Sequence, residues 1–373
     1  MRYALTLLLL FMMSLPSAAQ PSASPDGVVM PLDTFLRLRA APSIESAVLD
    51  QLYSGAALRI ISRTADNSWL EVETERYSTG WVYAEYVEVR IVLEDIPVRA
   101  GAGTALDYGS VVIGDVEHAR TIFQRGQQMG NRADVFAKVG DSITVSGHML
   151  HPISRRLYNL DQFAYLQPVI DYFSATPARD LDSFGNTSLA AGVGWSAAAV
   201  LDTQYANAEL CAPGESPLLC EYRLIRPGIA LIMFGTNDVG YVEASIYRHN
   251  MERIAAISID SGVLPVLSTI PVRVGYEAQV DQFNQIIRET ALTHRIPLWD
   301  YARAMATAGT VGIDEDGVHP SIPPHGYEGA ADFRPHNLYY GYVLRNLTAL
   351  HVLDTLWREV IAPQGGATIQ YAG

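Results

Sequence analysis

The second half of the chain alternates short apolar runs with segments that repeat at the period of a helix. Apolar runs of this length are typical of parallel strands buried on both faces. The expected strands are Val135–Val139, Ile229–Phe234 and Val263–Ile270. Helical patterns follow the last two, and another closes the chain, at Ile246–Ile259, Val280–Leu292 and Leu338–Ile361. Strands that alternate with helices predict an α/β sandwich built around a parallel sheet.

The first part of the chain has a different pattern, in which strand-like runs are short and separated by turn-forming residues. These runs lie between about residues 28 and 89, at Phe35–Leu38, Ala57–Ser62, Trp69–Val72 and Trp81–Tyr83. Such spacing predicts a small all-β barrel. Residues 93–132 then form a connector, in which Glu117–Met129 has a helical pattern that ends at Gly130.

The N-terminus has the order of a secretory signal peptide. Arg2 supplies a positive charge, Ala4–Leu15 is apolar, and small residues follow at Ser17–Ala19. The apolar stretch is too short to span a bilayer comfortably. We therefore expect a signal peptide at residues 1–19, and a mature protein that is secreted or associated with the cell envelope without stable membrane insertion.

Composition and charge narrow the possible functions. The length of 373 residues suggests two or three domains. The hydrophobic fraction of 49% is enough to form substantial cores. The formal net charge of −14 argues against nucleic acid as a partner, because phosphate binding needs clustered Lys and Arg. In an exported protein, Cys211 and Cys220 are expected to form a disulfide. The spacing of the two cysteines does not indicate a zinc site, and the sequence has no HExxH motif. We therefore expect no metal or other cofactor.

Three short motifs carry candidate chemistry. Gly140-Asp141-Ser142 follows the first expected strand, and Gly235-Thr236-Asn237-Asp238 follows the second. Ligands of parallel sheets bind beyond the carboxyl ends of the strands, so these motifs are expected at a binding site. The third motif, Asp316-Gly317-Val318-His319, lies near the end of the α/β region. A serine nucleophile needs a base such as histidine, and the histidine needs a third group to orient it.

The order of these motifs resembles that of the SGNH (GDSL-like) hydrolase/esterase family, over roughly residues 134–360. The resemblance implies a three-layer α/β/α sandwich with a flavodoxin-like parallel sheet. It also implies that Ser142 is the nucleophile, His319 its base and Asp316 the group that orients His319. Asp141 is interpreted as a structural residue of the turn.

The same resemblance implies an oxyanion hole with three donors. These are the backbone N–H of Ser142, the backbone N–H of a glycine, and the side-chain amide of Asn237. Two glycines compete for the second position. Gly194 is preferred because Gly-x-Ser before a helical alanine run fits the family pattern better, and Gly192 is the alternative.

The N-terminal block resembles a bacterial SH3-like domain. The residues that carry the resemblance are Leu36–Ser43, Ser68–Val72 and Gly80–Tyr83. Such domains often bind envelope material, although Trp69 and Trp81 also suit a simple barrel core. The expected organisation is a signal peptide at 1–19, an SH3-like domain at 27–92, the connector at 93–132 and the hydrolase domain at 133–362.

Other residues are expected to shape the site. Four further histidines compete with His319 as base and are interpreted as surface or pocket-lining residues: His148, His151, His325 and His336. Two inserted loops, Ile322–Asn337 and Cys211–Cys220, are predicted to shape the substrate pocket, because loops on a rigid scaffold commonly set specificity.

The sequence therefore predicts an exported serine esterase that acts through an acyl-enzyme. The expected substrate is a short acyl ester, such as an O-acetyl group, on a polysaccharide or cell-wall glycan. A lipase or lysophospholipase is one alternative. The others are a catalytically silent envelope-binding protein and a metal-dependent hydrolase.

Overall fold

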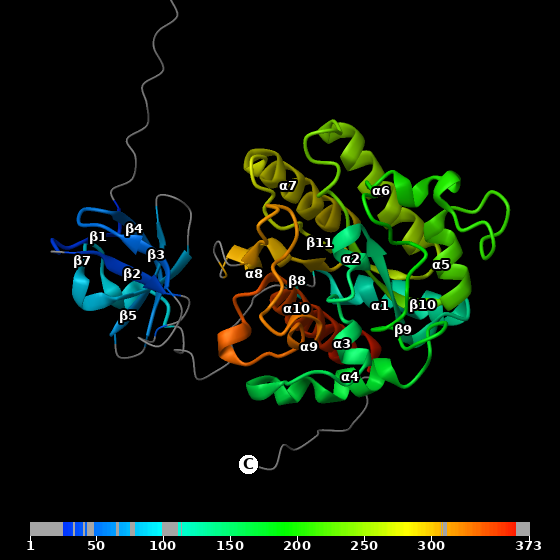
Figure 1. The fold of residues 1–373 in the computed structure, drawn as a ribbon, viewed down its shortest axis with the longest axis horizontal. Helices are drawn as coiled ribbons and strands as arrows, with labels where there is room; N and C mark the ends of the chain where they lie inside the picture. The colour runs from blue at the N-terminus through cyan, green and yellow to red at the C-terminus, as the bar shows by residue number, and fades with distance from the viewer. Residues whose placement is uncertain are drawn as a thin grey trace, which may run out of the picture.

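A computed structural model describes residues 25–32, 34–39, 42, 48–64, 67–74, 79–98, 111–112, 114–306, 308 and 312–362. The described chain forms an N-terminal β unit and a C-terminal α/β unit (Figure 1). The expected signal peptide, residues 1–19, lies outside the described residues. Within the described ranges, no helix combines the length and apolar character needed to cross a membrane.

The β unit is a single antiparallel sheet of seven strands in the order β3-β2-β6-β5-β4-β1-β7. The strands are β1 (Gly27–Val29), β2 (Leu36–Arg39), β3 (Val48–Leu52), β4 (Ala57–Arg63), β5 (Trp69–Thr74), β6 (Thr79–Tyr83) and β7 (Val87–Val89). Alternate side chains of β2 and β4 point into a core that includes Leu38, Leu58 and Val82. The predicted all-β unit is confirmed.

Strands β2 and β6 of the β unit approach each other closely at Gly80. Among the described residues, strands β2 and β6 are paired at Arg39 and Trp81. A Cβ atom at Gly80 would lie 2.8 Å from the Arg39 carbonyl oxygen and 2.8 Å from the Leu38 side chain. Glycine is therefore required where β6 crosses β2.

The α/β unit is built on a five-stranded sheet in the order β8-β12-β11-β10-β9. Its strands are β8 (Val111–Val112), β9 (Arg132–Gly140), β10 (Pro227–Met233), β11 (Leu264–Ser268) and β12 (Leu298–Trp299). All pairs are parallel except that between β8 and β12. Every residue of β10 and β11 is buried, as the apolar runs predict for central parallel strands.

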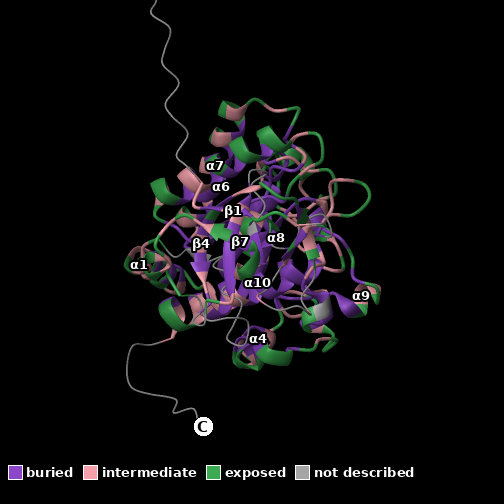
Figure 2. Cartoon of the chain, turned by 90° about the vertical axis from the view of Figure 1, so that its left-hand side faces the viewer, coloured by how far each residue is buried: buried purple, intermediate pink, exposed green. Residues whose placement is uncertain are grey.

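Helices flank this sheet on both sides and complete the predicted sandwich. The longer helices are α1 (Val116–Gln128), α4 (Gln167–Ser174), α5 (Pro217–Ile225), α6 (Ala244–Asp260), α7 (Glu277–His294) and α10 (Gly341–Leu356). Helices α6 and α7 pack on each other and on β11, whereas α10 contacts α4, β8 and β12 (Figure 1). Buried residues concentrate in the strands and in α10, and exposed residues lie on the outer helices (Figure 2).

Part of the expected connector contributes to the α/β unit. The helix predicted at 117–129 is α1, and it packs against β10 and β11. Its N-cap is Asp115, whose side chain accepts a hydrogen bond from the His118 backbone N–H at 2.8 Å. Strand β8 adds an antiparallel edge to the sheet. The domain boundaries themselves stay predictions.

Candidate active site

The first motif occupies a tight turn from β9 into the short helix α2 (Ser142–Val145). A Cβ atom at Gly140 would lie 2.2 Å from Thr144 Oγ1 and 2.6 Å from the Met233 carbonyl oxygen, so only glycine allows this turn. Asp141 caps α2, because its Oδ1 accepts a hydrogen bond from the Ile143 N–H at 3.0 Å. Burial raises the pKa of the Asp141 carboxyl to about 6. The turn places Ser142 at the carboxyl end of β9, half-buried.

Ser142, His319 and Asp316 form one hydrogen-bonded chain. Ser142 Oγ lies 2.9 Å from His319 Nε2, and His319 Nδ1 lies 2.6 Å from Asp316 Oδ2. The other Asp316 oxygen accepts the backbone N–H groups of Val318 at 2.8 Å and His319 at 2.9 Å. Partial burial raises the pKa of Asp316, but the hydrogen bonds from His319 and Val318 outweigh it and hold the pKa below its usual range. Asp316 is therefore ionised beside the imidazole near neutral pH.

Asn237 follows β10 and lies at the same edge of the sheet. Its Nδ2 donates a hydrogen bond to the Trp195 carbonyl oxygen at 3.1 Å. The next residue, Asp238, accepts the Ala197 N–H with both carboxylate oxygens at 3.1 Å. Burial raises the pKa of Asp238 to about 7. These contacts tie the loop after β10 to the loop that contains the two candidate glycines.

The two candidate glycines have different surroundings. The Gly192 N–H donates to the Gly140 carbonyl oxygen at 3.1 Å, and a Cβ atom at Gly192 would lie 2.2 Å from the Trp195 ring. Gly194 has φ +76°, and its Cβ position meets nothing within 4 Å. No acceptor for the Gly194 N–H is found among the described residues. The Gly192 N–H is thus used within the backbone, and the Gly194 N–H is not.

Residues Arg273–Tyr276, between β11 and α7, join two of the motif loops, and we call this segment the 273–276 clamp. Arg273 donates to the carbonyl oxygens of Thr236 at 2.6 Å and Val239 at 3.2 Å, on either side of Asn237. The Val274 N–H donates to the Gly317 carbonyl oxygen at 2.8 Å, between Asp316 and Val318.

Side-chain packing reinforces the 273–276 clamp. The Arg273 guanidinium lies 4.9 Å from the Tyr276 ring centroid. Gly240 has φ +84°, and a Cβ atom there would lie 2.3 Å from the Tyr276 ring. Gly317 has φ +69°, and a Cβ atom there would lie 2.9 Å from Val274 Cβ. No sequence motif marks the clamp, because it arises from contacts between three separate loops.

Two family models match the sequence. The bacterial SH3 domain matches residues 34–88, within the β unit. The GDSL-like lipase/acylhydrolase family matches residues 139–327, slightly more than half of the chain, and the match includes all three motifs. This chain belongs to the GDSL-like lipase/acylhydrolase family. It is an ester hydrolase acting on carboxylic ester bonds, and the predicted family is confirmed.

Several solved structures are similar to part of this GDSL-like acylhydrolase. A lipase/acylhydrolase from Enterococcus faecalis has 16% identity and a TM-score of 0.36, covering 57% of this chain and 95% of its own. A GDSL-like lipase from Bacteroides thetaiotaomicron has 13% identity and a TM-score of 0.35, covering 65% and 99%. An acetylxylan esterase from Geobacillus stearothermophilus has 14% identity and a TM-score of 0.36, covering 58% and 93%. No curated protein matches.

The described side chains of His148, His151 and His325 are not hydrogen-bonded to Ser142. His148 Nδ1 lies 3.2 Å from Ser146 Oγ, and its ring packs 5.3 Å from that of Tyr342. Burial lowers the pKa of His151 to about 4, so its ring is neutral. His325 is exposed before the short helix α9 (Gly326–Gly329), and the side chain of His336 lies outside the described residues.

The two inserted loops reach different places. Cys211 and Cys220 form the expected disulfide, which joins one loop to α5. The segment Ile322–Asn337 brings Tyr327 to the residues just after α2, where a Cβ atom at Gly147 would lie 3.8 Å from its ring. Sequence reasoning did not identify Tyr327 or Tyr342 as neighbours of His148, because the three residues lie far apart in the chain.

The described residues of the acylhydrolase contain one group of three potential metal ligands within reach of one another, Cys211, Glu215 and Cys220. Both cysteines are in the disulfide, so neither offers a thiolate. This group does not fit a metal ion.

Proposed function

We propose that this acylhydrolase is an exported serine esterase in which Ser142 is the nucleophile, His319 the base and Asp316 the orienting acid. The observation that carries the proposal is the continuous chain from Ser142 Oγ through both ring nitrogens of His319 to an ionised Asp316. A histidine held in this way can accept the serine proton and stabilise the resulting imidazolium.

The proposed reaction has two halves. His319 Nε2 takes the Ser142 proton while Oγ attacks the carbonyl carbon of the ester, and the proton then passes to the leaving alcohol. Water, deprotonated by His319, attacks the acyl-enzyme, releases the carboxylic acid and restores the Ser142 hydroxyl. Each half passes through a tetrahedral intermediate with a negative oxygen.

The proposed oxyanion donors are the backbone N–H groups of Ser142 and Gly194 and the side-chain amide of Asn237. The hydrogen bond from Asn237 Nδ2 to the Trp195 carbonyl oxygen uses one amide hydrogen and orients the other. Gly194 is preferred to Gly192 because the Gly192 N–H is already bonded to Gly140. Removal of one such donor typically lowers transition-state stabilisation by about 3 kcal/mol.

The proposed substrates are short acyl esters, such as O-acetyl groups, on a polysaccharide or cell-wall glycan. The signal-like N-terminus and the SH3 match support an extracellular or envelope location, where such polymers occur. We also propose that the β unit binds this envelope material and that the loops 211–220 and 322–337 shape the substrate pocket.

A lipase-type esterase is the second candidate, and one observation favours it. Exposed apolar side chains flank the proposed machinery, with Val193 beside Gly194 at 75% exposure and Val274 against Gly317 at 63% exposure. A longer acyl chain would cover these side chains and gain hydrophobic free energy.

Turnover of p-nitrophenyl esters from acetate to dodecanoate tests both candidates. The main proposal predicts the highest kcat/KM for acetate and no turnover by Ser142→Ala. A maximum at long chains would favour the lipase-type esterase. Turnover that survives Ser142→Ala would refute the serine mechanism, and turnover lost on addition of a chelator would indicate a metal-dependent hydrolase.

A further inference from the structure

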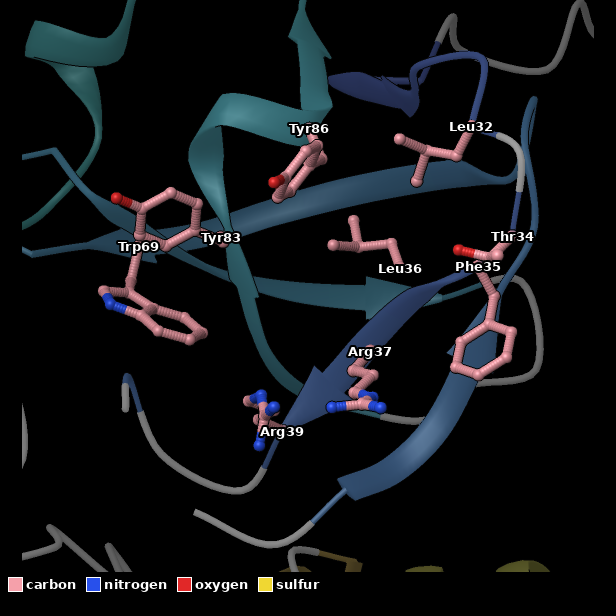
Figure 3. Close-up of a pocket in the computed structure, with 9 residues that line it drawn as sticks. All are labelled: Leu32, Thr34, Phe35, Leu36, Arg37, Arg39, Trp69, Tyr83 and Tyr86. Atoms are coloured by element: carbon pink, nitrogen blue, oxygen red, sulfur yellow. The ribbon is translucent and has the colours of Figure 1, made fainter. Parts of the chain in front are cut away.

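A groove of about 680 Å³ opens on the β unit, far in sequence from the proposed catalytic residues (Figure 3). One side comes from β2 and the loop before it, and the other comes from β5, β6 and the turn after β6. The lining residues are Leu32, Thr34, Phe35, Leu36, Arg37, Arg39, Trp69, Tyr83 and Tyr86. The buried side chain of Leu36 lies near the middle of the view, and the aromatic rings surround it.

Three of the rings form a row along one side of the groove. The ring centroids of Trp69 and Tyr83 are 5.2 Å apart, and those of Tyr83 and Tyr86 are 6.1 Å apart. Tyr86 is 41% exposed, although Trp69 is largely buried. The Trp69 and Tyr83 rings meet edge to face at 80°, and the Tyr83 and Tyr86 rings are tilted by 47°. The exposed Tyr86 ring is therefore the one that can pack against the C–H face of a sugar and leave hydroxyl groups at its edge for hydrogen bonds.

The charge of the groove is opposite to that of the chain. The whole chain carries a net charge of −14, yet the described lining residues include two arginines and no carboxylate. Arg37 is exposed, and Figure 3 shows Arg37 and Arg39 close together below Leu36. A guanidinium binds a carboxylate through two parallel hydrogen bonds. A neutral sugar would need acceptors for its hydroxyl protons, and the lining side chains offer only hydroxyl groups for this purpose.

We propose that this groove binds a carboxylate-bearing polysaccharide, with Tyr86 against a sugar ring and Arg37 at a carboxylate. A basic peptide would be repelled by the exposed Arg37. Binding here would hold the α/β unit close to a polymer and raise the effective concentration of its ester groups. That consequence rests on the proposed esterase function, whereas binding itself does not.

The test is binding of the full mature chain carrying Ser142→Ala, which prevents hydrolysis, to polygalacturonate by titration calorimetry. Arg37→Gln and Tyr86→Ala are expected to weaken binding about tenfold each, since each removes a charged or stacking contact. Arg90→Gln is the matched control, because Arg90 is an exposed arginine of the same unit outside the groove. It should bind as tightly as the parent. Fully methyl-esterified polygalacturonate, which lacks the charge, should bind weakly.

Several results would overturn the proposal. These are absence of binding to polygalacturonate, equal weakening by Arg90→Gln, or equal binding of the methyl-esterified polymer. Tighter binding of poly-glutamate would show that the groove prefers an acidic peptide. Thermal unfolding of each variant checks that the β unit is intact. Turnover of p-nitrophenyl acetate by the wild-type chain reports the esterase separately, so failure of either proposal is recognised without the other.

Discussion

Three carboxyl groups near the proposed site differ in their surroundings, and the differences separate their roles. Asp316 is about half exposed, at 49%, and hydrogen bonds from His319 and Val318 keep its pKa low. Asp141 and Asp238 are buried, and burial raises their pKa values to about 6 and about 7. Both accept backbone N–H groups at the ends of strands. Only Asp316 is hydrogen-bonded to a His319 ring nitrogen, so it is the acid we assign to the triad.

The proposed role of Asn237 as an oxyanion donor can be tested with one substitution. Asn237→Ala removes the side-chain amide and is expected to lower kcat by about 100- to 1,000-fold, with KM little changed. Steady-state kinetics on p-nitrophenyl acetate, normalised to active sites titrated with a covalent inhibitor, measure this effect. A kcat within about threefold of wild type would remove Asn237 from the oxyanion hole.

Lys138 predicts a dependence of stability on pH. The residue lies within β9 and is fully buried, with Nζ donating to the Phe184 carbonyl oxygen at 2.6 Å. Burial lowers its pKa from 10.5 to about 7. Between these values the folded chain binds fewer protons than the unfolded chain, so this residue makes the free energy of unfolding rise with pH. Below about pH 7 its contribution stays at its lowest value.

Lys138→Met should remove this contribution. Urea unfolding of wild type and variant at several pH values between about 7 and 10 gives the difference in unfolding free energy. The unfolding free energy of the wild type, relative to that of the variant, should increase as pH rises, by at most about 1.4 kcal/mol per pH unit. Parallel pH profiles for the two proteins would show that Lys138 is charged in the folded state.

Whether a strand or helix could be predicted from the sequence depended on its length and on how much of it is buried. Strands β10 and β11 and helices α6 and α7 were predicted within a few residues, because their apolar patterns extend over several residues. In the described part of the chain, strands β8 and β12 have two residues each, which is too few for a periodic pattern. The pairing that holds these short strands comes from the neighbouring strands and not from their own sequence.

The 273–276 clamp predicts a positioning role for Arg273. Arg273→Met removes the donors to Thr236 and Val239 and frees the loop that carries Asn237. We expect kcat for p-nitrophenyl acetate to fall about tenfold with KM within about twofold, because a misplaced donor weakens binding of the transition state more than binding of substrate. Arg273→Lys, which keeps one charged donor, should recover part of the loss.

Arg248→Met is the matched control for the 273–276 clamp. Arg248 pairs with Glu289 at 2.6 Å and joins α6 to α7 outside the motif loops. If both variants lose similar stability but only Arg273→Met loses kcat per titrated active site, Arg273 positions the site. Equal kcat losses, or a loss of stability without a loss of kcat, would leave Arg273 with a structural role only.

At the scale of the whole molecule, local motifs were predictable and contacts between distant segments were not. Gly-Asp-Ser, Gly-Thr-Asn-Asp and Asp-x-x-His can be recognised in the sequence because their residues are close together in the chain. In the fold, Ser142 Oγ lies 2.9 Å from His319 Nε2. Arg273 and Tyr327 have no neighbours in sequence that mark them. The groove on the β unit was also missed, because Trp69 has the pattern of a core residue and its position at the groove depends on Tyr83 and Tyr86.

If the groove binds a polymer, loss of Arg37 should affect hydrolysis of polymeric esters but not of soluble ones. Arg37→Gln should leave turnover of p-nitrophenyl acetate unchanged, because Arg37 lies in the β unit. On acetylated polygalacturonate at dilute concentration, acetate release should fall about tenfold, since binding to the polymer no longer raises the local ester concentration. Chromatographic measurement of released acetate checks this. Equal activity of wild type and variant on the polymer would mean that the groove does not assist hydrolysis.

Covalent labelling can show whether His319 and Asp316 activate Ser142. The chain is incubated with an organophosphate that phosphorylates activated serines, and the adduct is located by mass spectrometry of its peptides. If they do, we expect one adduct per chain, on Ser142, loss of turnover in proportion to labelling, and no adduct in Ser142→Ala or His319→Ala. An adduct on another residue, or full turnover in chains labelled at Ser142, would rule out Ser142 as the activated nucleophile.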